Sequence, residues 1–186
     1  MKDIIEAMYH YAQLGLPVFP VCPHNHNGMS NKHKSACNRP GKRPLIKNWQ
    51  NCGVPSARQI DEWANTWPCF NIGLLLGNPS GIVGIDVDGD GGQRLLRQLS
   101  GGELPPTWTF LTPNNGMRYL YRIPNNQVLK KFAVADATQN HCECALLGEG
   151  CQTVLPPSIH ANGGKYRWIT GPLSINQTSQ QLQSGW

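Results

Sequence analysis

The sequence lacks the features of a membrane or secreted protein. None of its apolar runs approaches the ~18–20 residues that a membrane-spanning helix needs. Its first residues, 1–7, form an amphipathic pattern that contains acids, which is unlike a secretory signal. We therefore expect a cytoplasmic protein that has no membrane partner.

Acidic residues are outnumbered by basic residues. The chain has 11 Asp and Glu against 16 Lys and Arg, and the net charge of +5 favours polyanionic partners, although many basic domains bind none. The chain has seven cysteines, an odd number, and several are interspersed with histidines. In a reducing compartment this pattern indicates free thiols or metal ligands rather than disulfides.

Internal repeats and coiled-coil heptads are absent from the sequence. A length of 186 residues fits one soluble globular domain.

Apolar spacing and turn residues predict the fold class. Helical spacing predicts helices over residues 2–13, 56–67 and 91–99, the second of them capped by Ser56. Residues 71–77 and 82–88 are predicted to form a hairpin through the turn-rich tetrapeptide 78–81. Further strands are expected over 18–21, 108–112, 117–123, 145–147, 153–155 and 165–169. Hairpins with few interleaved helices indicate an α+β fold, with a largely antiparallel sheet of hairpins flanked by helices on one side.

The apolar segment 82–88 ends in clustered acids and then runs into glycines. Because side chains alternate along a strand, Asp86 and Asp88 are expected on one face while Ile85 and Val87 point to the core. Like charges this close repel one another, so a cation between them would stabilise the pair. Mg²⁺ or Mn²⁺ suits carboxylate ligands and leaves positions for water and phosphates. The alternative is a strand-end turn whose aspartates are solvated.

A second group of ligands lies in the loop from Cys22 to Cys37. Three residues separate Cys22 from His26, and three separate His33 from Cys37. The four residues together form a Cys₂His₂ set suited to a tetrahedral structural Zn²⁺. His24 is the alternative to His26. The competing interpretation is a loop whose histidines are solvated.

Basic residues crowd the same region: Lys32, Lys34, Arg39, Lys42, Arg43 and Lys47. Cations along a groove hold single-stranded nucleic acid without strict sequence readout. The alternative is an ordinary solvated face.

The chain also contains an ordered series of short motifs. They occupy residues 41–45 (GKRPL), 71–77 (NIGLLLG), 84–89 (GIDVDG), 112–116 (TPNNG), 154–160 (VLPPSIH) and 166–168 (YRW). In this order they resemble the bifunctional primase-polymerase domain of the archaeo-eukaryotic primase superfamily, as found at the amino terminus of phage and plasmid replication proteins. The resemblance spans roughly residues 10–172. It implies an RRM-like catalytic core in a primase-polymerase domain over 1–175, with the Cys/His loop 22–39 inserted and a linker or tail over 176–186.

The resemblance also assigns roles to residues. Asp86 and Asp88 match the first metal-binding motif, and the chemistry is nucleotidyl transfer assisted by Mg²⁺ or Mn²⁺. The candidates for nucleotide binding are Lys42, Arg118, Ser158 and His160. Single-stranded DNA template, nucleoside triphosphates and a helicase domain or protein are the implied partners.

Two positions depart from the family pattern. Arg118 stands where the family has a histidine; arginine keeps a permanent charge and binds phosphate in a bidentate way, but it does not titrate as a histidine does. Ala145 stands where the family has a third acid, and Glu143, two residues earlier on the same strand face, is the candidate replacement. Glu149 is a weaker alternative. These departures leave two hypotheses, a DNA primase/polymerase and a catalytically weakened relative that acts as a nucleic-acid-binding or replication-assembly module.

Overall fold

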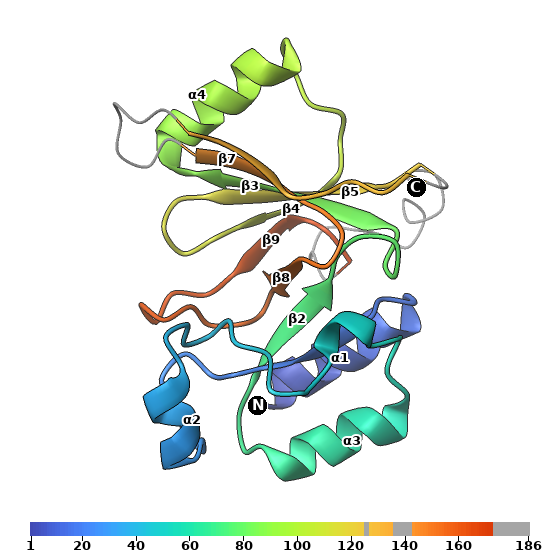
Figure 1. Ribbon diagram of the computed structural model, residues 1–186, viewed down its shortest axis with the longest axis vertical. Helices are drawn as coiled ribbons and strands as arrows, with labels where there is room; N and C mark the ends of the chain where they lie inside the picture. The colour runs from blue at the N-terminus through green and yellow to red at the C-terminus, as the bar shows by residue number, and fades with distance from the viewer. Residues whose placement is uncertain (125–126, 136–142, 173–186) are drawn as a thin grey trace. The chain divides into compact units, whose positions relative to one another are not determined.

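The structure is a computed structural model that describes residues 1–124, 127–135 and 143–172 (Figure 1). The chain forms two compact units. The first contains Met1–Leu75 and Gln152–Tyr166, and the second contains, of the described residues, 76–124, 127–135, 143–151 and 167–172. The predicted tail, 176–186, lies outside the described residues, and a single domain over 1–175 stays a prediction.

The first unit contains a small sheet and most of the helices. Its strands β1 (Val18–Val21), β2 (Asn71–Leu75) and β8 (Gln152–Leu155) lie in the order β1-β2-β8, and both pairs are antiparallel. The other elements of this unit are α1 (Lys2–Gln13), α2 (Asn31–Ala36), η1 (Trp49–Asn51) and α3 (Ala57–Thr66). Helix α1 packs against α3, β1 and β2. The fully buried Tyr11, Phe19 and Ile60 belong to the core of this unit.

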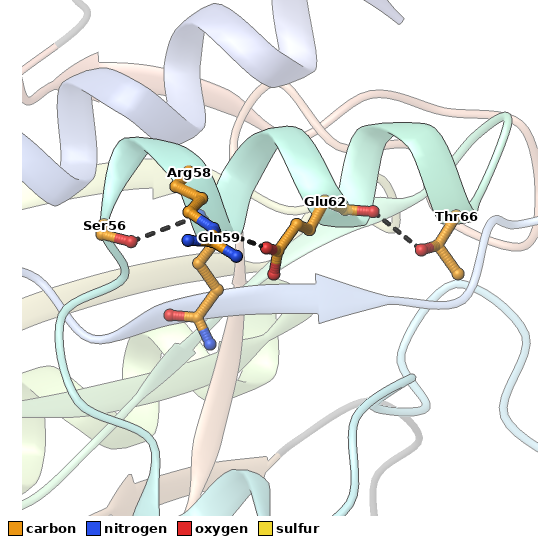
Figure 2. Close-up of polar contacts among 5 residues, drawn as sticks. All are labelled: Ser56, Arg58, Gln59, Glu62 and Thr66. Carbon is orange, nitrogen blue, oxygen red and sulfur yellow. Dashed lines mark hydrogen bonds and ion pairs between the residues drawn. The ribbon is translucent and has the colours of Figure 1, made fainter.

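Helix α3 shows how sequence dictates a helix start. Ser56 lies in extended backbone, and its hydroxyl accepts the Gln59 N–H at 3.2 Å, which confirms the predicted cap (Figure 2). Arg58 donates to Glu62 at 2.9 Å one turn along the helix. Since these two side chains are 89% and 59% exposed, the ion pair contributes only about 0.3–0.5 kcal/mol. At the carboxyl end, Thr66 donates its hydroxyl to the Glu62 carbonyl oxygen at 2.7 Å.

The second unit is built on an antiparallel sheet of six strands in the order β6-β7-β3-β5-β4-β9. The strands are β3 (Ile82–Asp88), β4 (Trp108–Leu111), β5 (Met117–Arg122), β6 (Phe132–Ala135), β7 (Glu143–Leu147) and β9 (Arg167–Thr170). Helix α4 (Gly89–Ser100) lies along β3 and β7 (Figure 1). It buries Leu96 against Val87 and Cys144, so one face of the sheet belongs to the core. Helices and antiparallel sheets confirm the predicted α+β class.

The predicted hairpin of 71–77 with 82–88 is wrong, and so is the single sheet. Strand β2 pairs with β1 and β8, whereas β3 pairs with β5 and β7 in the other sheet. Between the two segments, an isolated bridge joins Gly77 to Ile82, with the Gly77 N–H 2.8 Å from the Ile82 carbonyl oxygen. Both strands are central, and central strands take partners on two sides. Those partners lie far away in the sequence, where local turn signals carry no information about pairing.

Candidate functional site

Strand β3 lies between β5 and β7 and positions the predicted acids. Asp86 stands opposite Arg118 on β5 and Ala145 on β7, while Asp88 stands opposite Glu143 on β7. Residues directly opposite one another in an antiparallel pair project to the same face. Asp86, Asp88, Arg118 and Glu143 therefore share a face. The intervening residues of β3 belong to the opposite face, which packs against α4.

The cation beside Asp86 is a side chain of this chain. The Arg118 guanidinium donates through Nη2 at 2.6 Å and through Nε at 3.1 Å to the same Asp86 oxygen, Oδ1. The Arg118 side chain is 11% exposed and that of Asp86 30%, so water screens this pair less than a surface pair. A methyl group at Gly84 would meet the Arg118 Cδ at 3.4 Å, which places the aliphatic part of Arg118 over that glycine.

Asp88 ends β3 and lies at the cap position of α4. The first turn of a helix carries partial positive charge, which favours a carboxylate at this position. Gly116 leaves room beside it, because a Cβ there would lie 2.7 Å from the Val87 carbonyl oxygen and 3.3 Å from Asp88 Oδ1. In the sequence, Gly116 is the glycine of the turn that precedes Arg118 in the family's second motif, but its closeness to Asp88 was not predicted.

The structure distinguishes the two candidates for a third carboxylate. Ala145 is buried opposite Asp86 and offers no ligand. Glu143 is exposed and opposite Asp88, on the shared face. Glu149 instead accepts the Asn78 N–H at 2.7 Å and so supports the turn between Gly77 and Ile82. The Glu149 carboxylate is thus already used by a local hydrogen bond. Glu143 is therefore the better candidate for the third carboxylate.

In the first unit, Asn71 holds two of the recognised motifs together. This buried side chain donates to the carbonyl oxygens of Gly41 at 3.1 Å and Ile159 at 2.7 Å, and it accepts the Ile159 N–H at 3.0 Å. Lys42 directly follows Gly41 in the chain, and His160 directly follows Ile159. Both are thus carried by backbone that Asn71 fixes. The sequence contained the signal, a polar residue at the start of an apolar strand, but its role was not predicted.

Ser158 and His160 have different environments. The Ser158 side chain is fully buried and its hydroxyl accepts the Ile72 N–H at 3.0 Å, so its observed part is to position the loop. His160 is partly exposed, and its Nδ1 accepts the Asn162 N–H at 3.3 Å. A neutral imidazole that accepts at Nδ1 carries its proton on Nε2, where it can donate to an anion.

Asn71→Ala is expected to lower the free energy of unfolding by roughly 2–4 kcal/mol, because the substitution removes the hydrogen-bond partner of buried backbone at Gly41 and of half-buried backbone at Ile159. Urea denaturation followed by circular dichroism measures this change. Asn65→Ala is the matched control, since Asn65 is exposed on α3 and its loss should fall within about 0.5 kcal/mol. Equal stability of the two variants would contradict the positioning role.

The Cys/His loop brings its predicted ligands together. The ligand atoms of Cys22, His26, His33 and Cys37 all lie within 4.8 Å of one another. The two sulfurs are 3.8 Å apart. Two thiolates at 2.3 Å from a tetrahedral zinc would be about 3.8 Å apart, so this distance fits the ion. His26, and not the alternative His24, belongs to the group.

The environment of the loop also fits a metal. Nε2 of His26 and Nε2 of His33 are buried without a hydrogen-bond partner, which does not suit histidines solvated in a loose loop. Burial, followed by the charges of Arg43 and His26, lowers the pKa of His33, so its imidazole is neutral and able to bind. Burial raises the pKa of the Cys22 thiol, and a metal would have to displace its proton.

The loop is joined to the Lys42 motif by backbone contacts. The Cys22 N–H donates to the Arg43 carbonyl oxygen at 2.7 Å, and the Gly41 N–H donates to that of Pro23 at 3.3 Å. The loop also contains α2, which was not predicted and which Ser30 caps by accepting the His33 N–H at 3.2 Å. The basic residues of this region are exposed: Lys32, Lys34, Arg39, Lys42, Arg43 and Lys47.

Among residues 1–124, 127–135 and 143–172, the Cys/His group is the one set of three or more His, Cys, Asp or Glu placed to hold a metal. Asp86, Asp88 and Glu143 share a face but do not converge as such a set. Their chemistry suits Mg²⁺ or Mn²⁺, which take carboxylate oxygens. Arg118 occupies one of those oxygens.

The fold and these sites define an α+β protein with an acidic strand end and exposed basic segments, an arrangement suited to nucleotides and nucleic acid. The chain matches the family described as bifunctional DNA primase/polymerase, N-terminal, over residues 8–181, and it belongs to that family. This confirms the resemblance found in the sequence. DNA primase/polymerase is accordingly the general function, with DNA and nucleotides as substrates. A comparison with curated proteins gave no match. Within the part of the chain that the structure describes, no helix is long and apolar enough to span a membrane.

Proposed function

We propose that the chain catalyses template-directed nucleotidyl transfer that depends on Mg²⁺ or Mn²⁺, in the cytoplasmic replication of a phage or plasmid. The observation that carries this proposal is the pair Asp86 and Asp88 at the end of a central strand, in a chain of the primase/polymerase family. Single-stranded DNA is the proposed template. A helicase domain or protein is the proposed partner that opens it.

Each residue has a proposed part. Asp86 and Asp88, with Glu143, would hold the divalent metal, which when bound neutralises triphosphate charge and lowers the pKa of the attacking 3′-hydroxyl. Arg118 binds phosphate oxygens through its planar, permanently charged guanidinium. Lys42 and His160 bind phosphates of the nucleotide or template, and Ser158 supports the loop that carries His160. The Cys22, His26, His33 and Cys37 group holds a structural Zn²⁺.

The second candidate function is that of a nucleic-acid-binding or replication-assembly module. Two observations favour it: Ala145 faces Asp86 in place of an acid, and Arg118 already occupies an Asp86 oxygen. Extension of a labelled primer with Mg²⁺ or Mn²⁺ and deoxynucleotides separates the two. A chain that shifts single-stranded DNA in a gel but leaves the primer unextended under every metal tested would be the binding module.

Glu143→Gln is expected to lower the rate of primer extension by at least the roughly 10–100-fold that follows when a group that merely supports a metal ligand is lost. Glu149→Gln is the matched control. It should retain the rate, since the amide oxygen of glutamine can still accept the Asn78 N–H. Should Glu143→Gln extend primers like the unmodified chain while Ala145→Asp raises the rate, the site would be a two-carboxylate remnant.

A further inference from the structure

The ion pair between Arg118 and Asp86 differs from two ion pairs that lie within helices. Lys2–Glu6 and Arg58–Glu62 are one helical turn apart, and the side chains of both pairs are 59–89% exposed. Arg118 and Asp86 come from neighbouring strands, and at 11% and 30% their side chains are much less exposed. Two N–H groups converge on a single carboxylate oxygen. Of these three pairs, the least exposed thus involves one of the proposed metal ligands.

We propose that Arg118 is a resident counter-ion that competes with the divalent metal for Asp86. The inference rests on the proposed function for the role of Asp86 as a ligand. A metal can bind both carboxylate oxygens of Asp86 only after the guanidinium has left Oδ1. The phosphates of a nucleotide are the anions that would accept the guanidinium. In the absence of metal, the phosphates of a nucleotide and the Asp86 carboxylate therefore compete for the Arg118 guanidinium.

The competition follows from the charges and the geometry. A guanidinium and a divalent cation that share one carboxylate repel each other, and the repulsion is strong where water screens poorly. Across β3 from Arg118, the partner position is Ala145, so no third acid stands there to offset the added charge. Gly84 lies beneath the aliphatic part of Arg118 and leaves the side chain room to lie along the sheet. The nucleotide-free site therefore contains its own cation.

Mn²⁺ binding in the absence of nucleotide tests this directly. Free Mn²⁺ is measured by electron paramagnetic resonance in titrations of zinc-loaded protein. Arg118→Gln is expected to bind Mn²⁺ about tenfold more tightly than the unmodified chain. The gain should vanish in Arg118→Gln/Asp86→Asn, while Arg118→Lys, which keeps the charge, should show little gain. Arg58→Gln is the matched control, because it removes an exposed arginine from α3.

A second measurement does not depend on the fold of the Arg118 variants. In buffer without divalent metal, Asp86→Asn should bind a fluorescent deoxynucleoside triphosphate more tightly than the unmodified chain, because Arg118 is then released for phosphate. The Mn²⁺ titration and the triphosphate titration report the same coupling between Arg118 and Asp86, because the free energy that couples two binding events is reciprocal.

Unchanged Mn²⁺ affinity in a folded Arg118→Gln, or a gain that persists without Asp86, overturns the inference. So does unchanged triphosphate binding by Asp86→Asn. These outcomes are distinct from a failure of the proposed function, which appears as an unmodified chain that does not extend primers. A chain inactive in extension but with an Asp86-dependent gain in Mn²⁺ affinity would support the competition alone.

Discussion

Removal of zinc is expected to lower the melting temperature of the chain by on the order of 10 °C. The buried Nε2 atoms of His26 and His33 have no hydrogen-bond partner within the described structure, and Cys22 and Cys37 lie beside them. An ion on these ligands would fix a loop that connects through backbone hydrogen bonds to the Lys42 motif. Chelation should therefore destabilise the first unit and weaken single-stranded DNA binding together.

Elemental analysis of protein purified without chelator, with thermal melting before and after chelation, measures both halves of this prediction. We expect about one zinc per chain. Cys37→Ser should reproduce the loss of zinc and of thermal stability. Cys52→Ser is the matched control: Cys52 is half-buried outside the group, and burial raises the pKa of its thiol to about 11. Protein that contains no zinc, or a Cys37→Ser variant that melts like Cys52→Ser, would rule the site out.

Asp88→Asn and Asp86→Asn are each expected to reduce primer extension by roughly 10²–10³-fold or more, with the fold unchanged. A neutral amide is a poor ligand for a hard divalent cation, and these side chains lie at the end of a strand where an amide fits the same space. Steady-state incorporation rates at fixed Mg²⁺ or Mn²⁺ measure the effect, and circular dichroism reports the fold.

Asp90→Asn separates a metal-ligand role from a general loss of negative charge. Asp90 is also an exposed acid close to Asp88, but it lies in the first turn of α4 rather than on β3. It should retain most of the extension rate. Equal losses in Asp88→Asn and Asp90→Asn would assign the effect to bulk charge, and normal rates in both β3 variants would remove Asp86 and Asp88 from the chemistry.

Local chemistry was readable from the sequence. The cap of α3 at Ser56 followed from residue type, and the alternation of β3 placed Asp86 and Asp88 on one face. The Cys₂His₂ group was predicted from spacing within one loop, where ligands close in sequence are also close in space. In each case, the information lies within one short segment of the chain.

Pairings between distant segments could not be predicted in the same way. The hairpin prediction failed because β2 and β3 both look like strands next to a turn, while their partners come from elsewhere in the chain. Arg118 is 32 residues from Asp86, so a role in phosphate binding could be suggested but its ion pair could not. Asn71 joins segments 30 and 88 residues away, a function that only the folded chain reveals.

The most direct test of the central claim is single-nucleotide extension of a labelled primer by the unmodified chain. Each template offers one unpaired base next to the primer end, and each deoxynucleoside triphosphate is supplied alone with Mg²⁺, with Mn²⁺ or without divalent metal. The account predicts that only the complementary nucleotide is added, and only with metal. DNA binding without any addition, or addition that is independent of template or metal, would contradict it.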